Sequence, residues 1–107
     1  MTKEELLKQL PLSWQGDFDL DSLEQRDDGR FYLRHRGGIM VPIVIRDGYP
    51  TCDAPVEVLE EIRRCFPDSA AEIIPQLRYH SGLWSFTRWG MFVGIDLMSD
   101  GSVYIHS

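Results

Sequence analysis

The stretch LWSFTRWGMFVGIDLMSDGSVYIH, residues 83–106, carries the clearest information about the fold. Its aromatic and β-branched residues favour strands, but the stretch is too long to be a single strand, which usually has about five or six residues. Gly90 and Gly101 are residues that tight turns favour. The sequence therefore predicts antiparallel strands over 83–87 and 91–98, and a last strand after a hairpin loop at 99–101.

The alternation of side chains then predicts two different faces for these strands. A three-residue loop at 99–101 sets Leu97 opposite Val103 and Ile95 opposite Ile105, which gathers aliphatic residues on one face. We expect the main helix to cover that face. Trp84, Phe86 and Phe92 are expected on the opposite, uncovered face.

Upstream of this stretch the sequence predicts three helices. Thr2 and Glu5 form a capping box that starts a short helix, and Pro11 ends it. A second and longer helix is predicted over 54–66, with Asp53 as its N-cap and apolar residues at helical spacing. This apolar stripe contains Leu59, Ile62 and Phe66, with Val58 and Cys65 beside them. A further capping box, Ser69 with Glu72, predicts a helix of about two turns before Pro75.

The remaining strands are predicted in the first half of the chain. Residues 23–25 and 31–36 flank Asp27-Asp28-Gly29 and should pair as a hairpin, with Leu23 opposite Leu33 and Glu24 opposite Tyr32. Residues 38–46 read as a strand covered on both faces, but Pro42 cannot donate to a ladder and favours an edge position or a bulge. The predicted fold is one α+β domain over residues 1–107. An antiparallel sheet of five or six strands carries the 54–66 helix on one face, and short helices lie at its edges.

Composition and charge exclude several classes of function. The 107 residues are 43% hydrophobic and 26% charged, with a net charge of −6, which is unfavourable for binding a phosphate backbone. The longest apolar run, residues 38–45, is too short to span a bilayer, and the N-terminus does not resemble a signal peptide. We therefore expect a cytoplasmic protein that binds neither nucleic acid nor membranes directly. Residues 29–46 form a basic strip with four arginines and no acid. This strip either binds an acidic partner or forms ion pairs with the protein's own carboxylates, and we favour the ion pairs.

Catalytic and cofactor motifs are weak or missing in the sequence. Asp17, Asp19 and Asp21 have the spacing of calcium ligands, but Ser22 stands where the loop needs glycine, so no metal or cofactor is predicted. Cys52 and Cys65 have no ligand spacing, and the sequence leaves open whether they pair. Cys65 is expected in the core, and Cys52 is expected in a loop before a helix. Asp96 and His106, with His80, could form an acid/base site, which gives a small enzyme or ligand-binding domain as the alternative function.

The aromatic stretch gives the preferred function. Tryptophan and arginine dominate protein-protein hot spots, so the sequence predicts that a larger protein binds Trp84, Phe86, Arg88, Trp89 and Phe92. The acidic residues Asp17, Asp19 and Asp21 would face a basic surface on that partner, such as a toxin or a nucleic-acid-processing complex, and a homodimer is compatible with the same surfaces. In size, acidity and lack of motif, the chain is similar to small bacterial immunity proteins and phage-encoded anti-CRISPR inhibitors, classes that share no sequence signature. The similarity implies a non-enzymatic inhibitor that occludes a functional surface.

Overall fold

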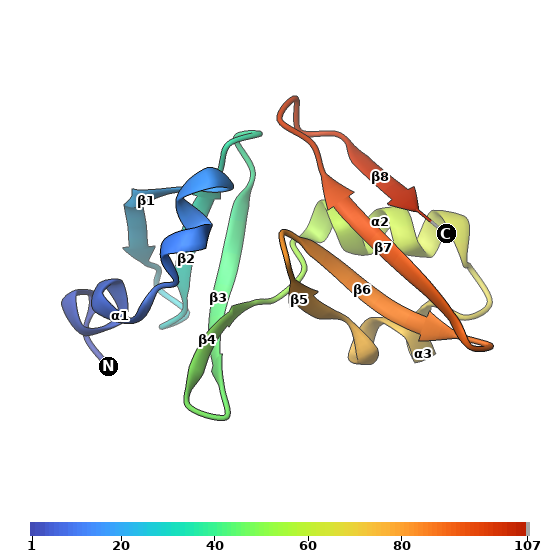
Figure 1. The fold of residues 1–107 in the computed structure, drawn as a ribbon, viewed down its shortest axis with the longest axis horizontal. Helices are drawn as coiled ribbons and strands as arrows, with labels where there is room; N and C mark the ends of the chain where they lie inside the picture. Colours follow the sequence, from blue (N-terminus) through green and yellow to red (C-terminus); the bar gives the residue numbers. More distant parts are fainter. Residues whose placement is uncertain (107) are drawn as a thin grey trace.

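The computed structural model describes residues 1–106 as two four-stranded antiparallel sheets with helices against them (Figure 1). The strand order is β1-β2-β3-β4 in the first sheet and β5-β6-β7-β8 in the second, so each sheet is a meander of consecutive hairpins. The strands of the first sheet are β1 (Phe18–Gln25), β2 (Phe31–His35), β3 (Met40–Arg46) and β4 (Tyr49–Cys52). Those of the second sheet are β5 (Arg78–His80), β6 (Leu83–Arg88), β7 (Met91–Leu97) and β8 (Val103–His106).

The N-terminal helices pack beside the first sheet. Helix α1 (Lys3–Gln9) begins with the predicted capping box, in which the Glu5 amide donates to the Thr2 hydroxyl at 3.1 Å and the Thr2 amide donates to the Glu5 carboxylate. Pro11 separates it from the 3-10 helix η1 (Leu12–Gly16). Leu6, Leu10 and Trp14 are buried, and these side chains attach both helices to the core.

Helix α2 (Val56–Cys65) covers one face of the second sheet and lies behind β6, β7 and β8 in Figure 1. Val58 and Ile62 are fully buried, and the Phe66 ring just past the helix packs edge-on against Phe86 at 5.8 Å between centroids. The short α3 (Ala70–Ile73) and η2 (Ile74–Gln76) then lead to β5. The predicted cap of Ser69 does not form, because its side chain makes no capping hydrogen bond.

The α+β class is confirmed, but the prediction of one sheet with five or six strands and one main helix is wrong. Strands β4 and β5 were missed, and the eight strands of residues 1–106 divide equally between two sheets. Both missed strands have weak local signals, because β4 contains Pro50 and β5 has only three residues. Their neighbouring strands, rather than their own sequence, hold them extended.

Pro42 lies in an inner strand, contrary to the predicted edge position. The backbone nitrogen and carbonyl of one strand residue point toward the same neighbour in an antiparallel ladder. The Pro42 carbonyl accepts from the Asp53 amide at 3.0 Å, so its missing donor faces the end of β4 and not β2. The proline therefore removes no hydrogen bond between β2 and β3.

A bulge in β1 changes the predicted register of the first hairpin. Glu24 lies opposite Tyr32 as predicted, but the ladder is interrupted between Asp19 and Glu24, so the predicted Leu23–Leu33 pair is absent. Ser22 occupies this gap, where its hydroxyl accepts from the Arg34 amide at 2.8 Å and donates to the Asp19 carbonyl. The side chain thus replaces a backbone partner.

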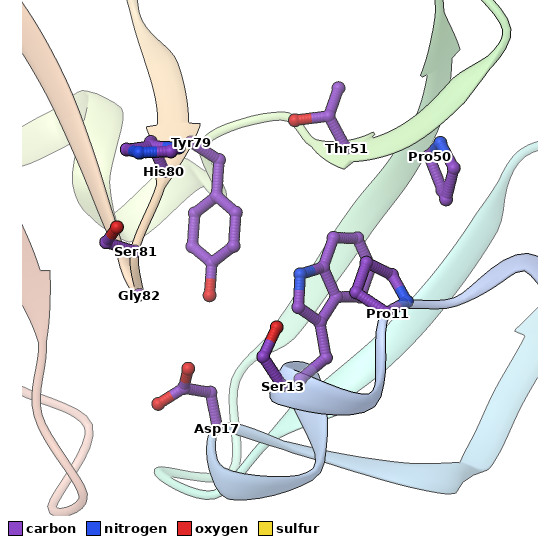
Figure 2. A pocket seen from close by; sticks show the side chains of 10 residues that line it. Pro11, Ser13, Asp17, Pro50, Thr51, Tyr79, His80, Ser81 and Gly82 are labelled. Atoms are coloured by element: carbon purple, nitrogen blue, oxygen red, sulfur yellow. The ribbon is translucent and has the colours of Figure 1, made fainter.

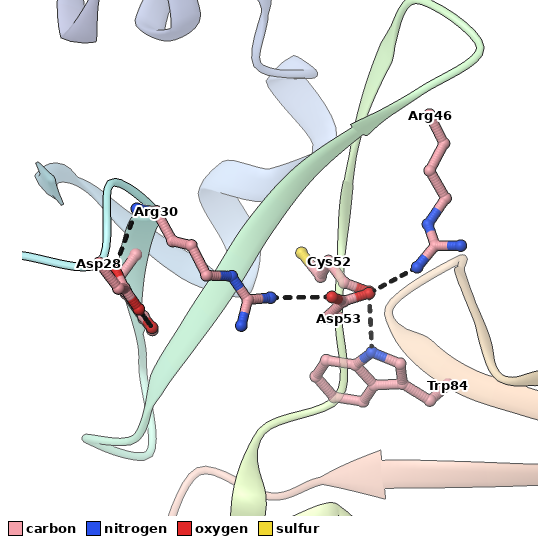
Figure 3. A network of polar contacts seen from close by, with 7 residues as sticks. Asp28, Arg30, Arg46, Cys52, Asp53 and Trp84 are labelled. Atoms are coloured by element: carbon pink, nitrogen blue, oxygen red, sulfur yellow. Dashed lines mark hydrogen bonds and ion pairs between the residues drawn. The ribbon is translucent and has the colours of Figure 1, made fainter. Parts of the chain in front are cut away.

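Polar contacts tie the segment after β4 to both sheets (Figure 3). The Trp84 indole N–H of β6 donates to the buried Cys52 carbonyl at 3.2 Å. The Asp53 carboxylate accepts from Arg30 at 2.9 Å and from Arg46 at 2.7 Å. Asp53 is therefore occupied by two arginines of the first sheet and does not cap α2, whose N-cap is Pro55.

The two sheets share one hydrophobic core. Their loops also approach each other closely, because a Cβ at Gly37, after β2, would lie 2.5 Å from the Met98 carbonyl oxygen and 3.0 Å from the Gly101 nitrogen. Only glycine fits this crossing of two backbones. Among residues 1–106, no helix has the length and apolar character needed to cross a bilayer.

Candidate functional site

The register of the β6–β7 hairpin decides which aromatic residues of the opening stretch are accessible. Trp84 lies opposite Ile95 and Phe86 lies opposite Val93, and residues directly opposite one another share a face. Trp84 and Phe86 consequently belong to the inner, helix-covered face, with 1% and 4% exposure. The expectation that these two rings face outward is wrong, which removes them from any contact surface.

Trp89 occupies the tip of this hairpin and is 86% exposed. Trp89 and Gly90 both have positive φ, of 52° and 74°, as the two central residues of a type I′ turn require. The hairpins at Asp47-Gly48 and Ser81-Gly82 have the same positive φ pattern, but they place short polar residues at the first position. A bulky residue in this conformation is uncommon and strained. The Arg88 guanidinium stacks on the Trp89 ring, 4.3 Å from its centre.

The outer face of the second sheet begins beside this turn. Phe92 lies opposite Thr87, as predicted points away from the helix, and is 62% exposed. A Cβ at Gly94 would touch both the Leu83 and the Phe92 side chains, so these two flank the glycine from either side. The exposed Trp89 and Phe92, with the half-buried Leu83, are called the β6–β7 surface below.

The three acidic residues of 17–21 have different environments. The Asp19 carboxylate forms an ion pair with Arg34 at 2.8 Å, and Asp21 is exposed. Asp17 is half-buried between η1 and β1 and lines a cavity. The structure therefore does not present them as one acidic patch.

The arginines of 29–46 pair mainly within the protein. Arg30 and Arg46 bind Asp53, and Arg34 binds Asp19. The fourth, Arg36, donates to the Gly16 carbonyl at 3.2 Å. The favoured interpretation of the basic strip, pairing with the protein's own carboxylates, is confirmed for three of its members.

Asp96 and His106 lie near each other on the outer face, with 3.9 Å between carboxylate and imidazole. Both side chains are substantially exposed. His80 lies on β5, which is separated from β7 by β6, so that about 10 Å of sheet separates it from Asp96. The three residues are not brought together as an acid/base site.

The two cysteines are free, and their burial is the reverse of what was expected: Cys52 is buried and Cys65 is exposed. Cys52 is buried at the end of β4, and burial raises the pKa of its thiol far above the usual range. Cys65 is exposed on α2, where desolvation and a hydrogen bond to Glu61 raise its thiol pKa. Neither thiol has the lowered pKa that a reactive nucleophile needs.

A cavity of about 470 Å³ lies where the two sheets meet (Figure 2). It is bounded by η1, by β4 and by the β5–β6 turn. Its lining residues are Pro11, Ser13, Trp14, Asp17, Pro50, Thr51, Tyr79, His80, Ser81 and Gly82.

Tyr79 stands in the centre of this cavity, with its hydroxyl directed toward Asp17 and the Ser81-Gly82 turn (Figure 2). Its ring packs edge-on against Trp14 at 5.9 Å. Burial, together with the nearby Cys52 and Asp17, raises the pKa of the Tyr79 hydroxyl well above its usual range. The phenol therefore stays neutral in the physiological range.

Sequence reasoning did not find this cavity, although it named Asp17 and His80 for other roles. Trp14 and Tyr79 lie far apart in the sequence, and no motif links them. The Ser81-Gly82 pair was the available signal, because two such residues between apolar segments predict a tight hairpin.

Comparison of the chain with protein-family models, with curated proteins and with solved structures gave no match. The fold and the accessible side chains therefore carry the functional argument alone.

Proposed function

We propose that the protein is a non-enzymatic inhibitor or adaptor that docks its β6–β7 surface on a larger protein and occludes the surface it covers. The observation that carries the proposal is Trp89, an 86% exposed ring in a left-handed backbone conformation. Trp89 contributes little to the fold, since its ring lies outside the core.

The conformational cost of Trp89 is offset only in part within the fold, by stacking of its ring with Arg88. A left-handed conformation costs a non-glycine residue roughly 1–2 kcal/mol, and the exposed ring buries little apolar area. The equivalent positions of the other two hairpins are occupied by Asp47 and Ser81, short polar residues for which a left-handed conformation costs less. Binding of a partner that buries the ring would provide the stabilising apolar contact that the fold does not. Tryptophan is a preferred anchor in protein interfaces.

Charge supports a basic partner. The chain carries a net charge of −6, and most arginines of 29–46 are already bound to its own carboxylates. An acidic body is attracted to a basic surface, and the attraction accelerates association at low salt. The immunity-protein-like and anti-CRISPR-like function expected above, the occlusion of a toxin or a nucleic-acid-processing complex, agrees with this chemistry.

The test compares variants of exposed aromatic residues. Proteins retained from a host lysate by the immobilised wild-type chain are identified, purified and titrated calorimetrically with Trp89→Ala and Phe92→Ala. Each change is expected to weaken binding about 30-fold or more while the melting temperature stays close to wild type. Association of the wild-type pair should slow as salt is raised.

Tyr49→Ala is the matched control, because Tyr49 is 75% exposed beside a hairpin turn of the first sheet. It should bind like the wild type. Equal affinities for all three variants would refute the docking surface. A homodimer in sedimentation that Trp89→Ala dissociates would assign the surface to a second copy of this chain instead.

A further inference from the structure

The cavity between the sheets is lined by the Asp17 carboxylate, which forms no ion pair with a cationic side chain of residues 1–106. The backbone of Asp17 is fully engaged, since its amide donates to Trp14 and its carbonyl accepts from Arg36. Its side chain forms no ion pair with any group of residues 1–106 and has only the neutral Tyr79 hydroxyl as a nearby hydrogen-bonding group, whereas Asp19 and Asp53 both hold arginines. A half-buried charge of this kind is favourable when a ligand supplies the opposite charge.

Arg36 is the cationic residue of this chain whose backbone amide donates to the Asp17 carbonyl. Its guanidinium nevertheless binds the Gly16 carbonyl at 3.2 Å and does not reach the carboxylate. On the other side, a Cβ at Gly82 would lie 3.4 Å from the Asp17 carboxylate, so the glycine keeps this side of the carboxylate open.

The walls of the cavity suit the stem and the head of a long cationic side chain. Pro11 and Pro50 provide apolar surface for methylene groups (Figure 2), and Trp14 also lines the cavity. The neutral Tyr79 hydroxyl and the Ser13 hydroxyl can accept N–H donors beside the carboxylate. Aromatic rings also attract ammonium and guanidinium groups.

Other ligand classes fit less well. An anion would meet the Asp17 charge within an acidic protein. Residues 1–106 contain no group of three or more His, Cys, Asp or Glu side chains placed to hold a metal ion. The volume of about 470 Å³ lies in the range of small-ligand sites and accommodates one extended side chain.

We propose that this cavity binds one lysine or arginine side chain of the protein partner, with Asp17 as its counter-ion. This rests on the proposed function, because a basic partner supplies such side chains. It extends the contact from the β6–β7 surface to a second point at the junction of the sheets.

The experiment uses the whole chain and capped amino acids as probes. N-acetyl-lysine methylamide and N-acetyl-arginine methylamide are titrated while the backbone amide NMR signals are followed, and N-acetyl-norleucine methylamide serves as the uncharged probe. We expect saturable shifts at Ser13, Asp17, Ser81 and Gly82 with at least one cationic probe, at millimolar concentrations, and none with norleucine. Asp17→Asn should weaken this binding at least about tenfold. Asp21→Asn, which changes an exposed acid on the neighbouring β1, should leave it unchanged.

The remaining outcomes separate the possible explanations. Shifts of equal size in Asp17→Asn, or no saturable shift with either cationic probe, would overturn the proposal. Putrescine binding more than tenfold tighter than both capped amino acids would replace the partner side chain by a free small cation. The proposed function fails separately, if Trp89→Ala and Phe92→Ala keep full affinity for the purified partner.

Discussion

At position 89, the residue type that would favour stability differs from the one that would favour partner binding. Asparagine tolerates positive φ and forms the favoured Asn-Gly type I′ turn, so Trp89→Asn relieves strain of about 1 kcal/mol. The lost stacking with Arg88 removes about 0.5 kcal/mol from an exposed site. We expect a small net rise in the free energy of unfolding, measured by urea denaturation, together with weaker partner binding.

Asp47→Asn is the control for this change, because Asp47 has the same conformation and no ring to lose. Its stability should stay within about 0.5 kcal/mol of wild type. A loss of more than about 1 kcal/mol in Trp89→Asn would show that the ring stabilises the fold, contrary to its exposure.

His35 couples the stability of the protein to pH. The imidazole is 4% exposed and its Nδ1 accepts from the Gly37 amide at 3.0 Å, an arrangement that needs the neutral ring. Burial lowers the pKa of His35, with Arg36 adding to this effect and the carboxylates of Asp17 and Asp96 opposing it. In the unfolded chain the group has its ordinary pKa of about 6.5.

The unfolded state therefore binds more protons than the folded state once the pH falls below about 6.5. The contribution of His35 to stability is complete above that pH and is lost as the pH falls through the lowered pKa of the folded state, by at most about 1.4 kcal/mol per pH unit. Urea midpoints between pH 7 and pH 5 measure it. In His35→Asn, whose amide oxygen can still accept from Gly37, the decline should be shallower; an equally steep decline would attribute it to other groups.

At the scale of the element, the orientation of α2 is the feature that thiol labelling tests. Cys65 is exposed on α2, whereas Cys52 is 4% exposed and its carbonyl accepts from the Trp84 indole. We expect a thiol reagent such as DTNB to modify one cysteine of the folded protein and both after unfolding. Cys65→Ser should abolish native labelling and Cys52→Ser should preserve it. Fast labelling of Cys52 would mean that the β4 end opens or that α2 is rotated.

At the scale of the whole molecule, the close backbone contact between the loop at Gly37 and the loop at Gly101 joins the two sheets. A methyl group at position 37 would lie 2.5 Å from the Met98 carbonyl oxygen, and backbone cannot move aside as a flexible side chain can. We expect Gly37→Ala to lower the free energy of unfolding by about 1–3 kcal/mol, as overpacking does. Urea denaturation measures this change.

Gly16→Ala is the matched control, because a Cβ at Gly16 meets no atom within 4 Å and its φ is not positive. It should change stability little. Equal midpoints for the two variants would mean that the sheets move independently and share less of the core than their packing implies.

Local chemistry was sufficient to predict much of the chain. The Thr2–Glu5 capping box, the turn at Gly90 and the Leu97–Val103 and Ile95–Ile105 pairs all occur as predicted, because each depends on residues close in sequence. The failed placement of Trp84 was also local in origin. A two-residue loop at Trp89-Gly90 sets Phe86 opposite Val93, and counting this register would have placed both rings inside.

The division into two sheets and the junction between them depended on tertiary structure alone. Pro50 and the three-residue β5 carry little strand signal, and only the neighbouring strands hold these segments extended. The cavity brings Trp14 and Asp17 to Tyr79 from segments more than sixty residues apart in the printed sequence. Composition and local spacing determine which elements form and which residues are apolar. Which face is covered, and which carboxylate is left without a cation, follows from packing between distant segments, since pairing and burial depend on atoms that the local sequence does not contain.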